Sequence, residues 1–278
     1  MGRPSSTERS WLDPWTVGAI AVVAYALSNV VHEGLGHGGA CVLVGGRPKE
    51  LNAVFFDCSV EGLPSAAARW VAAGGSIANL LFAALAWAGI RGLPRDWGRE
   101  RQFTWLMLAI NLLMPFGYLL FSGLGGIGDW AVVIDGIQPA LAWRIGLTAL
   151  GAVLYFVVTP PLLMAELEPF LGTGAETRIA RARTLTLLPY VVGGTLFVVA
   201  GLLNPYGLQL VLISAAAASF GGTSLLAWYP VVWARRARGG TEPPLGVGRS
   251  VAWLVLALVV AGLFIGVLGP GVRLSRSD

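Results

Sequence analysis

The chain has 278 residues, of which 55% are hydrophobic and only 12% are charged, and its formal net charge is +4. With a mean hydropathy of +0.70, this composition excludes an ordinary soluble globular protein and predicts an integral membrane protein. The excess of Arg and Lys lies in short segments between apolar runs, which indicates membrane topology and gives no support to a nucleic-acid-binding surface.

Apolar segments of about 20 residues, each long enough to cross a bilayer as a helix, recur along the chain. We predict an all-α polytopic membrane protein with about seven transmembrane helices, at residues 15–44, 67–90, 103–122, 142–165, 185–203, 208–230 and 250–269. With the N-terminus inside, 13 of the 19 basic residues fall on the inner side, which favours an N-in, C-out orientation. We expect a multi-pass protein in the lipid bilayer of a prokaryotic plasma membrane.

The first predicted span holds both histidines of the protein, in the run His-Glu-Gly-Leu-Gly-His at residues 32–37. Ionisable groups at membrane depth are costly and by default functional. In the common zinc motif His-Glu-x-x-His, two imidazoles four residues apart face one ion. Here His32 and His37 are five apart, which leaves their rings roughly 140° apart on a regular helix. A π-type turn, eased by Gly34 and Gly36, would restore one face, so we predict a widened helix between the histidines.

The segment after this span, residues 45–66, contains β-branched and aromatic side chains with flanking Gly and Pro. It favours a short membrane-associated β-hairpin, and an ordinary amphipathic loop is the alternative. The two cysteines, Cys41 and Cys58, form no disulfide framework in our interpretation. Cys41 follows His37 by four residues and is a candidate stray ligand, but we interpret it as a small buried residue.

Three further stretches carry polar groups inside or beside the next spans. The run Gly-Gly-Ser-Ile-Ala-Asn at residues 74–79 allows close helix approach, and Asn79 needs a partner there. Asn111 and Pro115 combine a polar group with a helix kink. Four glycines within residues 123–128 precede Asp129 and predict irregular backbone that is buried or lines a wet cavity.

Taken together, these motifs resemble the site-2 protease family of intramembrane zinc metalloproteases. That family carries His-Glu-x-x-His, then Gly-Pro-x-x-Asn, then Asn-x-x-Pro-x-x-x-Leu-Asp-Gly, whose Asp is the third zinc ligand. This chain has the pieces in the same order, with Ser76 in place of Pro and one extra residue between Asn111 and Pro115. Its histidine spacing is also found in the soluble dipeptidyl peptidase III family.

The likeness covers about residues 15–136. It implies a metalloprotease-like core at residues 1–140, with three spans and the Gly-rich loop, and a C-terminal transmembrane scaffold of four spans at residues 141–278, which together form one structural unit. The chain shows no internal repeat, so an inverted-repeat transporter gains no support.

The third ligand departs from the family pattern, because Leu119 stands eight residues after Asn111, where the family has Asp. The acid must come from Asp129 or Asp135. Asp135 lies in Ile-Asp-Gly, which is close to the family's Leu-Asp-Gly. We choose Asp129, because it is nearer to the family spacing and directly follows the glycine-rich run; Trp130 beside it is expected to anchor the segment at the membrane interface.

The resemblance implies a zinc-dependent protease that hydrolyses peptide bonds of membrane-protein substrates. His32, His37 and Asp129 would hold Zn²⁺, and Glu33 would act as general base. Asn79 and Asn111 would hold substrate or support a ligand, and interhelical hydrogen bonding is an equally favoured role.

Two other functions stay open. The first is a catalytically inactive protease-like membrane protein that binds membrane partners, favoured by the altered spacing and the missing Leu-Asp-Gly. The second is a metal-ion transporter. It is less favoured, because the other spans offer few metal ligands.

Overall fold

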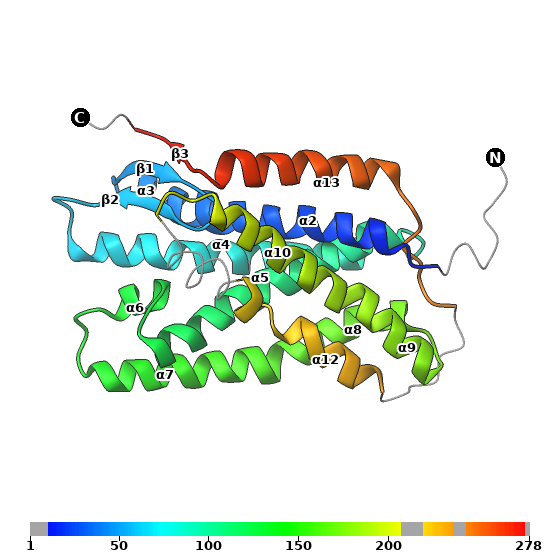
Figure 1. Ribbon diagram of the computed structural model, residues 1–278. Coiled ribbons are helices and arrows are strands. Elements are labelled where there is room, and N and C mark those ends of the chain that lie inside the picture. The colour runs from blue at the N-terminus through cyan, green and yellow to red at the C-terminus, as the bar shows by residue number, and fades with distance from the viewer. Residues whose placement is uncertain (1–10, 207–218, 236–242, 276–278) are drawn as a thin grey trace.

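The computed structural model describes residues 11–206, 219–235 and 243–275 of the protein (Figure 1). They are mostly helical, and six of the helices are long and apolar enough to cross a membrane: Pro14–Leu43, Ser65–Gly92, Gly98–Gly125, Ala140–Leu171, Ala175–Leu202 and Val251–Leu268. Each of these six overlaps a predicted span, although the helix Ala175–Leu202 begins well before the predicted residue 185. The predicted span at 208–230 falls partly on residues 207–218, which lie outside the described residues, so the count of seven stays a prediction.

The first long helix consists of α2 (Pro14–Val30), the π-helix η1 (Val31–Gly38) and α3 (Gly39–Leu43). It begins at Pro14 because the Asp13 carboxylate accepts hydrogen bonds from the Thr16 backbone at 3.1 Å and from the Thr16 hydroxyl at 2.6 Å. Two helices of 28 residues follow, α4 (Ser65–Gly92) and α5 (Gly98–Gly125).

The later helices complete the bundle. They are α6 (Asp129–Ile134), α7 (Ala140–Val153), η2 (Leu154–Val158), α8 (Thr159–Leu171), α9 (Ala175–Ala182), η3 (Arg183–Leu187), α10 (Leu188–Leu202), α12 (Leu225–Ala234), α13 (Val251–Leu263) and η5 (Phe264–Leu268). Helices α7, η2 and α8 run on from one another, as do α9, η3 and α10, and as do α13 and η5.

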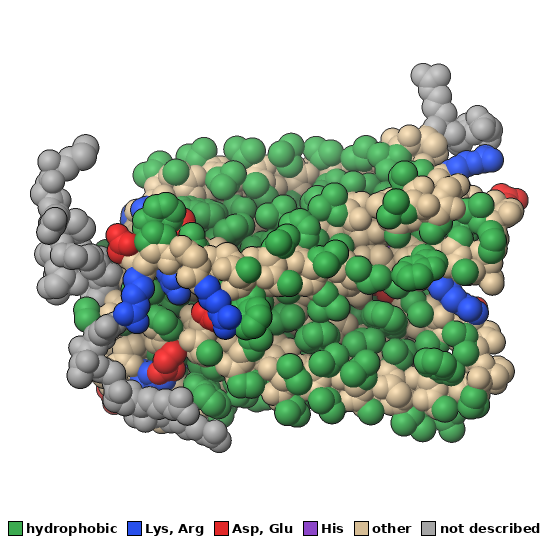
Figure 2. Space-filling view, turned by 180° about the vertical axis from the view of Figure 1, so that it is seen from behind, with side chains coloured by type: hydrophobic (Ala, Val, Ile, Leu, Met, Phe, Trp, Pro, Cys, Tyr) green, Lys and Arg blue, Asp and Glu red, His purple; other side chains and the backbone are tan. Residues whose placement is uncertain are grey.

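Helix α5 lies at the centre of the bundle, against α2, α4 and α7. Helix α13 lies on the outside against α2, and Val251, Leu258 and Leu263 on it are exposed (Figure 1). Figure 2 shows hydrophobic side chains over the middle of one face, with the charged side chains gathered toward its two ends. An apolar belt between charged ends is what a bilayer requires, so the fold supports a multi-pass membrane protein.

A small sheet lies at one end of the bundle, in the strand order β2-β1-β3. Strands β1 (Arg47–Leu51) and β2 (Phe56–Ser59) form the predicted hairpin, with Leu51 opposite Phe56. The hairpin is therefore confirmed. A third strand, β3 (Val272–Arg273), pairs with the other edge of β1 and was not predicted, because two residues carry no periodic signal. Within the described residues β2 keeps an unpaired edge.

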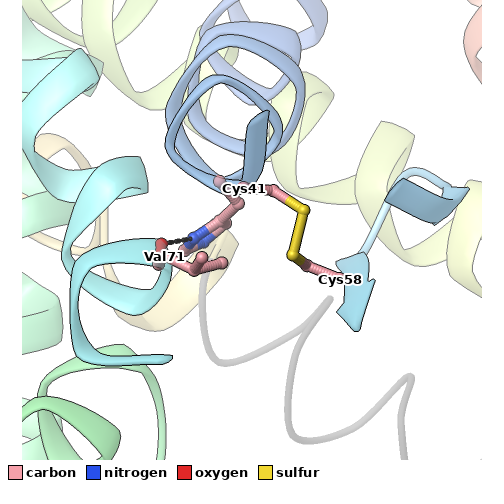
Figure 3. Close-up of a disulfide and its surroundings, with 4 residues drawn as sticks. Cys41, Cys58 and Val71 are labelled. Carbon is pink, nitrogen blue, oxygen red and sulfur yellow. Dashed lines mark hydrogen bonds between the residues drawn. A yellow bond between two sulfur atoms is a disulfide. The ribbon is translucent and has the colours of Figure 1, made fainter. Parts of the chain in front are cut away.

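Cys41 of α3 and Cys58 of β2 form a disulfide, with their Cα atoms 6.0 Å apart (Figure 3). Cys41 is buried as we interpreted it, but the expectation that the two cysteines form no disulfide framework was wrong. The two cysteines are 17 residues apart, and only the fold of the hairpin back onto α3 brings them together. Closing a loop of this length stabilises a fold by about 3 kcal/mol. The disulfide fastens the hairpin to the helix that carries the histidines.

Candidate metal centre

The helix between the two histidines is widened as predicted, because π-helix η1 covers Val31–Gly38. The wider turn places His32 and His37 on one face, with their Nε2 atoms 3.2 Å apart. Their rings meet edge to face at a centroid distance of 4.7 Å. Glu33 stands beside them, with its Oε2 3.9 Å from Nε2 of His37. All three side chains are buried.

Close packing of η1 on α4 depends on glycine at Gly36 and Gly75. A methyl group on Gly36 would lie 2.5 Å from the Cα of Gly75, and one on Gly75 would lie 2.7 Å from Nε2 of both His32 and His37. Both distances are shorter than a Cβ atom can approach another atom, so only glycine fits at these two positions. The small residues of α4 therefore make the cradle in which the imidazoles lie, as the sequence predicts for this run.

Asp129 reaches the histidines from α6. Its Oδ2 lies 3.2 Å from Nε2 of His32 and 3.5 Å from Nε2 of His37. Helix α5 continues to Gly125, so the irregular backbone is shorter than predicted and is confined to the turn before α6. Gly126 and Gly128 adopt φ of +67° and +88° there, a conformation that favours glycine.

Two hydrogen bonds fasten α6 to α4. The indole nitrogen of Trp130 donates to the Ser76 hydroxyl at 3.0 Å, and Arg69 donates to the backbone carbonyl of Asp135 at 2.8 Å. Trp130 therefore anchors the segment to a neighbouring helix, and its position at the membrane interface stays a prediction. The Asp135 residue is exposed, so the structure brings Asp129 to the histidines and not Asp135.

Behind His32, Asn79 and Asn111 form a buried chain of hydrogen bonds. Nδ1 of His32 faces Oδ1 of Asn79 at 2.5 Å, and Nδ2 of Asn79 donates to Oδ1 of Asn111 at 2.5 Å. Asn111 then donates to the Ser28 hydroxyl at 2.8 Å. Neither Asn lines the cavity beside the histidines, so the geometry favours support of the imidazole over contact with a substrate.

The hydrogen bonds fix which imidazole nitrogens are free. Nδ1 of His37 lies 2.7 Å from the Val71 carbonyl oxygen, which only accepts, so this nitrogen donates; Nδ1 of His32 likewise donates to Asn79. Each neutral ring then presents an unprotonated Nε2, and both point at Asp129.

Nε2 of His32, Nε2 of His37 and Oδ2 of Asp129 form a triangle with sides of 3.2, 3.2 and 3.5 Å. Metal–ligand distances of about 2.0–2.1 Å in a tetrahedral site separate the ligand atoms by roughly 3.3 Å. The three atoms therefore fit one tetrahedral cation. Oδ2 of Asp129 also has no hydrogen-bond partner among the described residues, as expected of an atom placed to bind a cation.

A cavity of about 370 Å³ opens beside this triangle. Glu33, His37, Asp129 and Tyr118 line it together with the hairpin residues 54–58. Oε2 of Glu33 is buried and has no hydrogen-bond partner among the described residues. A carboxylate in this position can take a proton from a water molecule held in the cavity.

Sequence reasoning missed three residues of this centre. Val71 and Ser28 act through a backbone carbonyl and a hydroxyl, which leave no motif in the sequence. Tyr118, whose ring stacks on His32, differs in no sequence feature from other aromatic residues of an apolar span. Comparison of the chain with protein-family models, with curated proteins and with solved structures finds no match.

Proposed function

We propose that the protein is a zinc-dependent protease that cuts peptide bonds of membrane-protein substrates. The observation that carries this proposal is the triangle of His32, His37 and Asp129, whose three free ligand atoms fit one tetrahedral ion. Three nitrogen and oxygen ligands with a fourth position left open to a cavity are typical of catalytic zinc sites.

The residues around the triangle have different roles in peptide hydrolysis. Zinc bound there would lower the pKa of a coordinated water and polarise the scissile carbonyl. Glu33 takes a proton from the attacking water and gives it to the leaving amine, because its free carboxylate oxygen lies beside the cavity. Asn79 keeps the His32 ring in the orientation that presents Nε2.

The hairpin supplies a place for an extended substrate. Residues of β2 line the cavity, and the outer edge of β2 is unpaired within the described residues. An extended peptide can add a strand to such an edge through backbone hydrogen bonds. This matters for a membrane substrate, since a helix must unwind before its peptide bonds can be attacked.

The purified protein in detergent tests the proposal directly. We expect about one zinc per chain by elemental analysis, and cleavage of a panel of single-span membrane proteins and of an unfolded labelled polypeptide. A chelator should stop the cleavage and added zinc should restore it. A protein that holds no zinc and cuts none of these substrates would contradict the proposal. Zinc without cleavage would support the inactive protease-like alternative.

The alternative of a metal-ion transporter finds less support. In the part of the chain that the structure describes, the close metal-binding side chains gather in one place, where Glu33 and Asp129 lie beside His32 and His37. A transport pathway needs successive ligand sites across several helices.

The hydrogen bond between Trp130 and Ser76 gives a prediction about metal affinity. Trp130→Phe and Ser76→Ala should each weaken zinc binding by roughly tenfold, because loss of either group frees α6 and the Asp129 carboxylate with it. A competition assay against a chelator measures the change. Trp143→Phe is a matched control, since Trp143 is exposed on α7. Unchanged zinc affinity in both single variants would show that this bond does not position Asp129.

A further inference from the structure

Tyr118 of α5 holds a fixed position beside the metal-binding triangle. Its ring stacks on the His32 ring, with centroids 5.3 Å apart and planes 12° apart. The turn before α6 also lies against it, since a methyl group on Gly128 would stand 3.4 Å from the Tyr118 ring. The phenol is therefore in contact with both the first histidine and the segment that presents Asp129.

The Tyr118 hydroxyl differs from four other tyrosine hydroxyls of the chain. Tyr25, Tyr155, Tyr190 and Tyr206 each make a side-chain hydrogen bond, at 2.9, 2.9, 3.3 and 3.2 Å. No residue in the described ranges makes one with the Tyr118 hydroxyl. Tyr118 is half-buried on the wall of the cavity, so a hydroxyl without a protein partner there is available to a water molecule or a ligand in the cavity.

The cavity wall offers few other proton donors. The polar side chains that line it are those of Glu33, His37, Asp57, Asp129 and Tyr118. Three of them are carboxylates, which only accept hydrogen bonds when ionised, and His37 already uses its Nδ1 proton on Val71. Among the described lining residues, Tyr118 is therefore the side chain that can donate a hydrogen bond to a bound substrate.

We propose that Tyr118 is a catalytic residue that donates a hydrogen bond to the oxyanion of the tetrahedral intermediate. This inference rests on the proposed function. Attack on a peptide carbonyl places negative charge on the carbonyl oxygen, and a donor aimed at that charge stabilises the transition state more than the ground state.

The step balances without any further reactant. The water oxygen bonds to the carbonyl carbon while Glu33 takes the water's proton, and the carbonyl π electrons move to the oxygen. Tyr118 keeps its proton and shares it in a hydrogen bond with that oxygen. When the carbonyl re-forms, the C–N bond breaks, and the leaving amine takes the proton from Glu33.

Tyr118→Phe tests the inference, since it removes one oxygen atom and keeps the ring that stacks on His32. We expect unchanged zinc content, an unchanged KM, and a kcat lower by about 10²–10³, as for other single oxyanion donors. A peptide phosphinate, which carries a tetrahedral oxyanion, should bind the zinc-loaded variant more weakly than wild type by a similar factor. Tyr190→Phe is the matched control. It also removes a tyrosine hydroxyl, one that donates a hydrogen bond to the Phe220 carbonyl.

The outcomes separate this inference from the proposed function. If wild type cleaves and Tyr118→Phe has the same kcat, the role of Tyr118 is overturned and the protease stands. If wild type binds zinc without detectable cleavage, equal phosphinate affinities of wild type and variant overturn the role. If wild type binds neither zinc nor phosphinate, the proposed function fails and the role of Tyr118 fails with it.

Discussion

Zinc is expected to be lost from both His32→Ala and His37→Ala, because each variant removes one corner of a three-atom site. Asp129→Asn should weaken zinc binding sharply, since an amide oxygen carries no charge to offset that of the ion. We expect losses larger than the 10–100-fold that typically follow the removal of a hydrogen bond that only supports a ligand. Elemental analysis of the purified variants and competition against a chelator measure them.

Asp135→Asn is the matched control for the third ligand. Asp135 is exposed at the end of α6, so this variant should bind zinc as wild type does. The opposite order, with zinc lost from Asp135→Asn and kept in Asp129→Asn, would move the site to Asp135. Full zinc in either histidine variant would show that the two histidines do not share an ion.

Glu33→Gln should keep the fold and the zinc but lose proteolysis. The substitution preserves the size of the side chain and removes the carboxylate that takes the proton from water. General bases typically contribute about 10²–10⁴ in rate, so kcat should fall by that factor while KM changes little. Single-turnover cleavage of a labelled membrane substrate measures the loss of rate. The zinc content is measured on the same sample.

Glu61→Gln provides a carboxylate control for this measurement, because Glu61 is exposed beyond β2. Undiminished cleavage by Glu33→Gln would rule out Glu33 as the base. Loss of zinc from Glu33→Gln would instead indicate that Glu33 is a ligand.

Features set by local chemistry could be predicted from the sequence. Length and hydropathy predict six of the helices, because a bilayer dictates both. The π-helix follows from one geometric demand, that His32 and His37 face the same side. The hairpin follows from aromatic and β-branched residues between turn formers.

Features that depend on contacts distant in sequence could not be predicted. The pairing of Cys41 with Cys58 and of β1 with β3 depends on how the ends of separate helices meet. The contact of Trp130 with Ser76 joins residues 54 apart and has no motif. The spacing from Asn111 was needed to choose Asp129 over Asp135. The local sequence match, Ile-Asp-Gly, pointed to Asp135, which is not the carboxylate that lies close to the histidines.

The disulfide between Cys41 and Cys58 bears on which side of the membrane the centre faces. Disulfides persist in oxidising compartments and are rare in the cytosol. Cys58 belongs to the strand that lines the cavity, so the mouth of the cavity and the disulfide share one end of the bundle. We therefore expect that end to face away from the cytosol, as the distribution of Arg and Lys predicts. A substrate cut there would shed its fragment outward, and the portion left in the membrane would keep its cytosolic side intact.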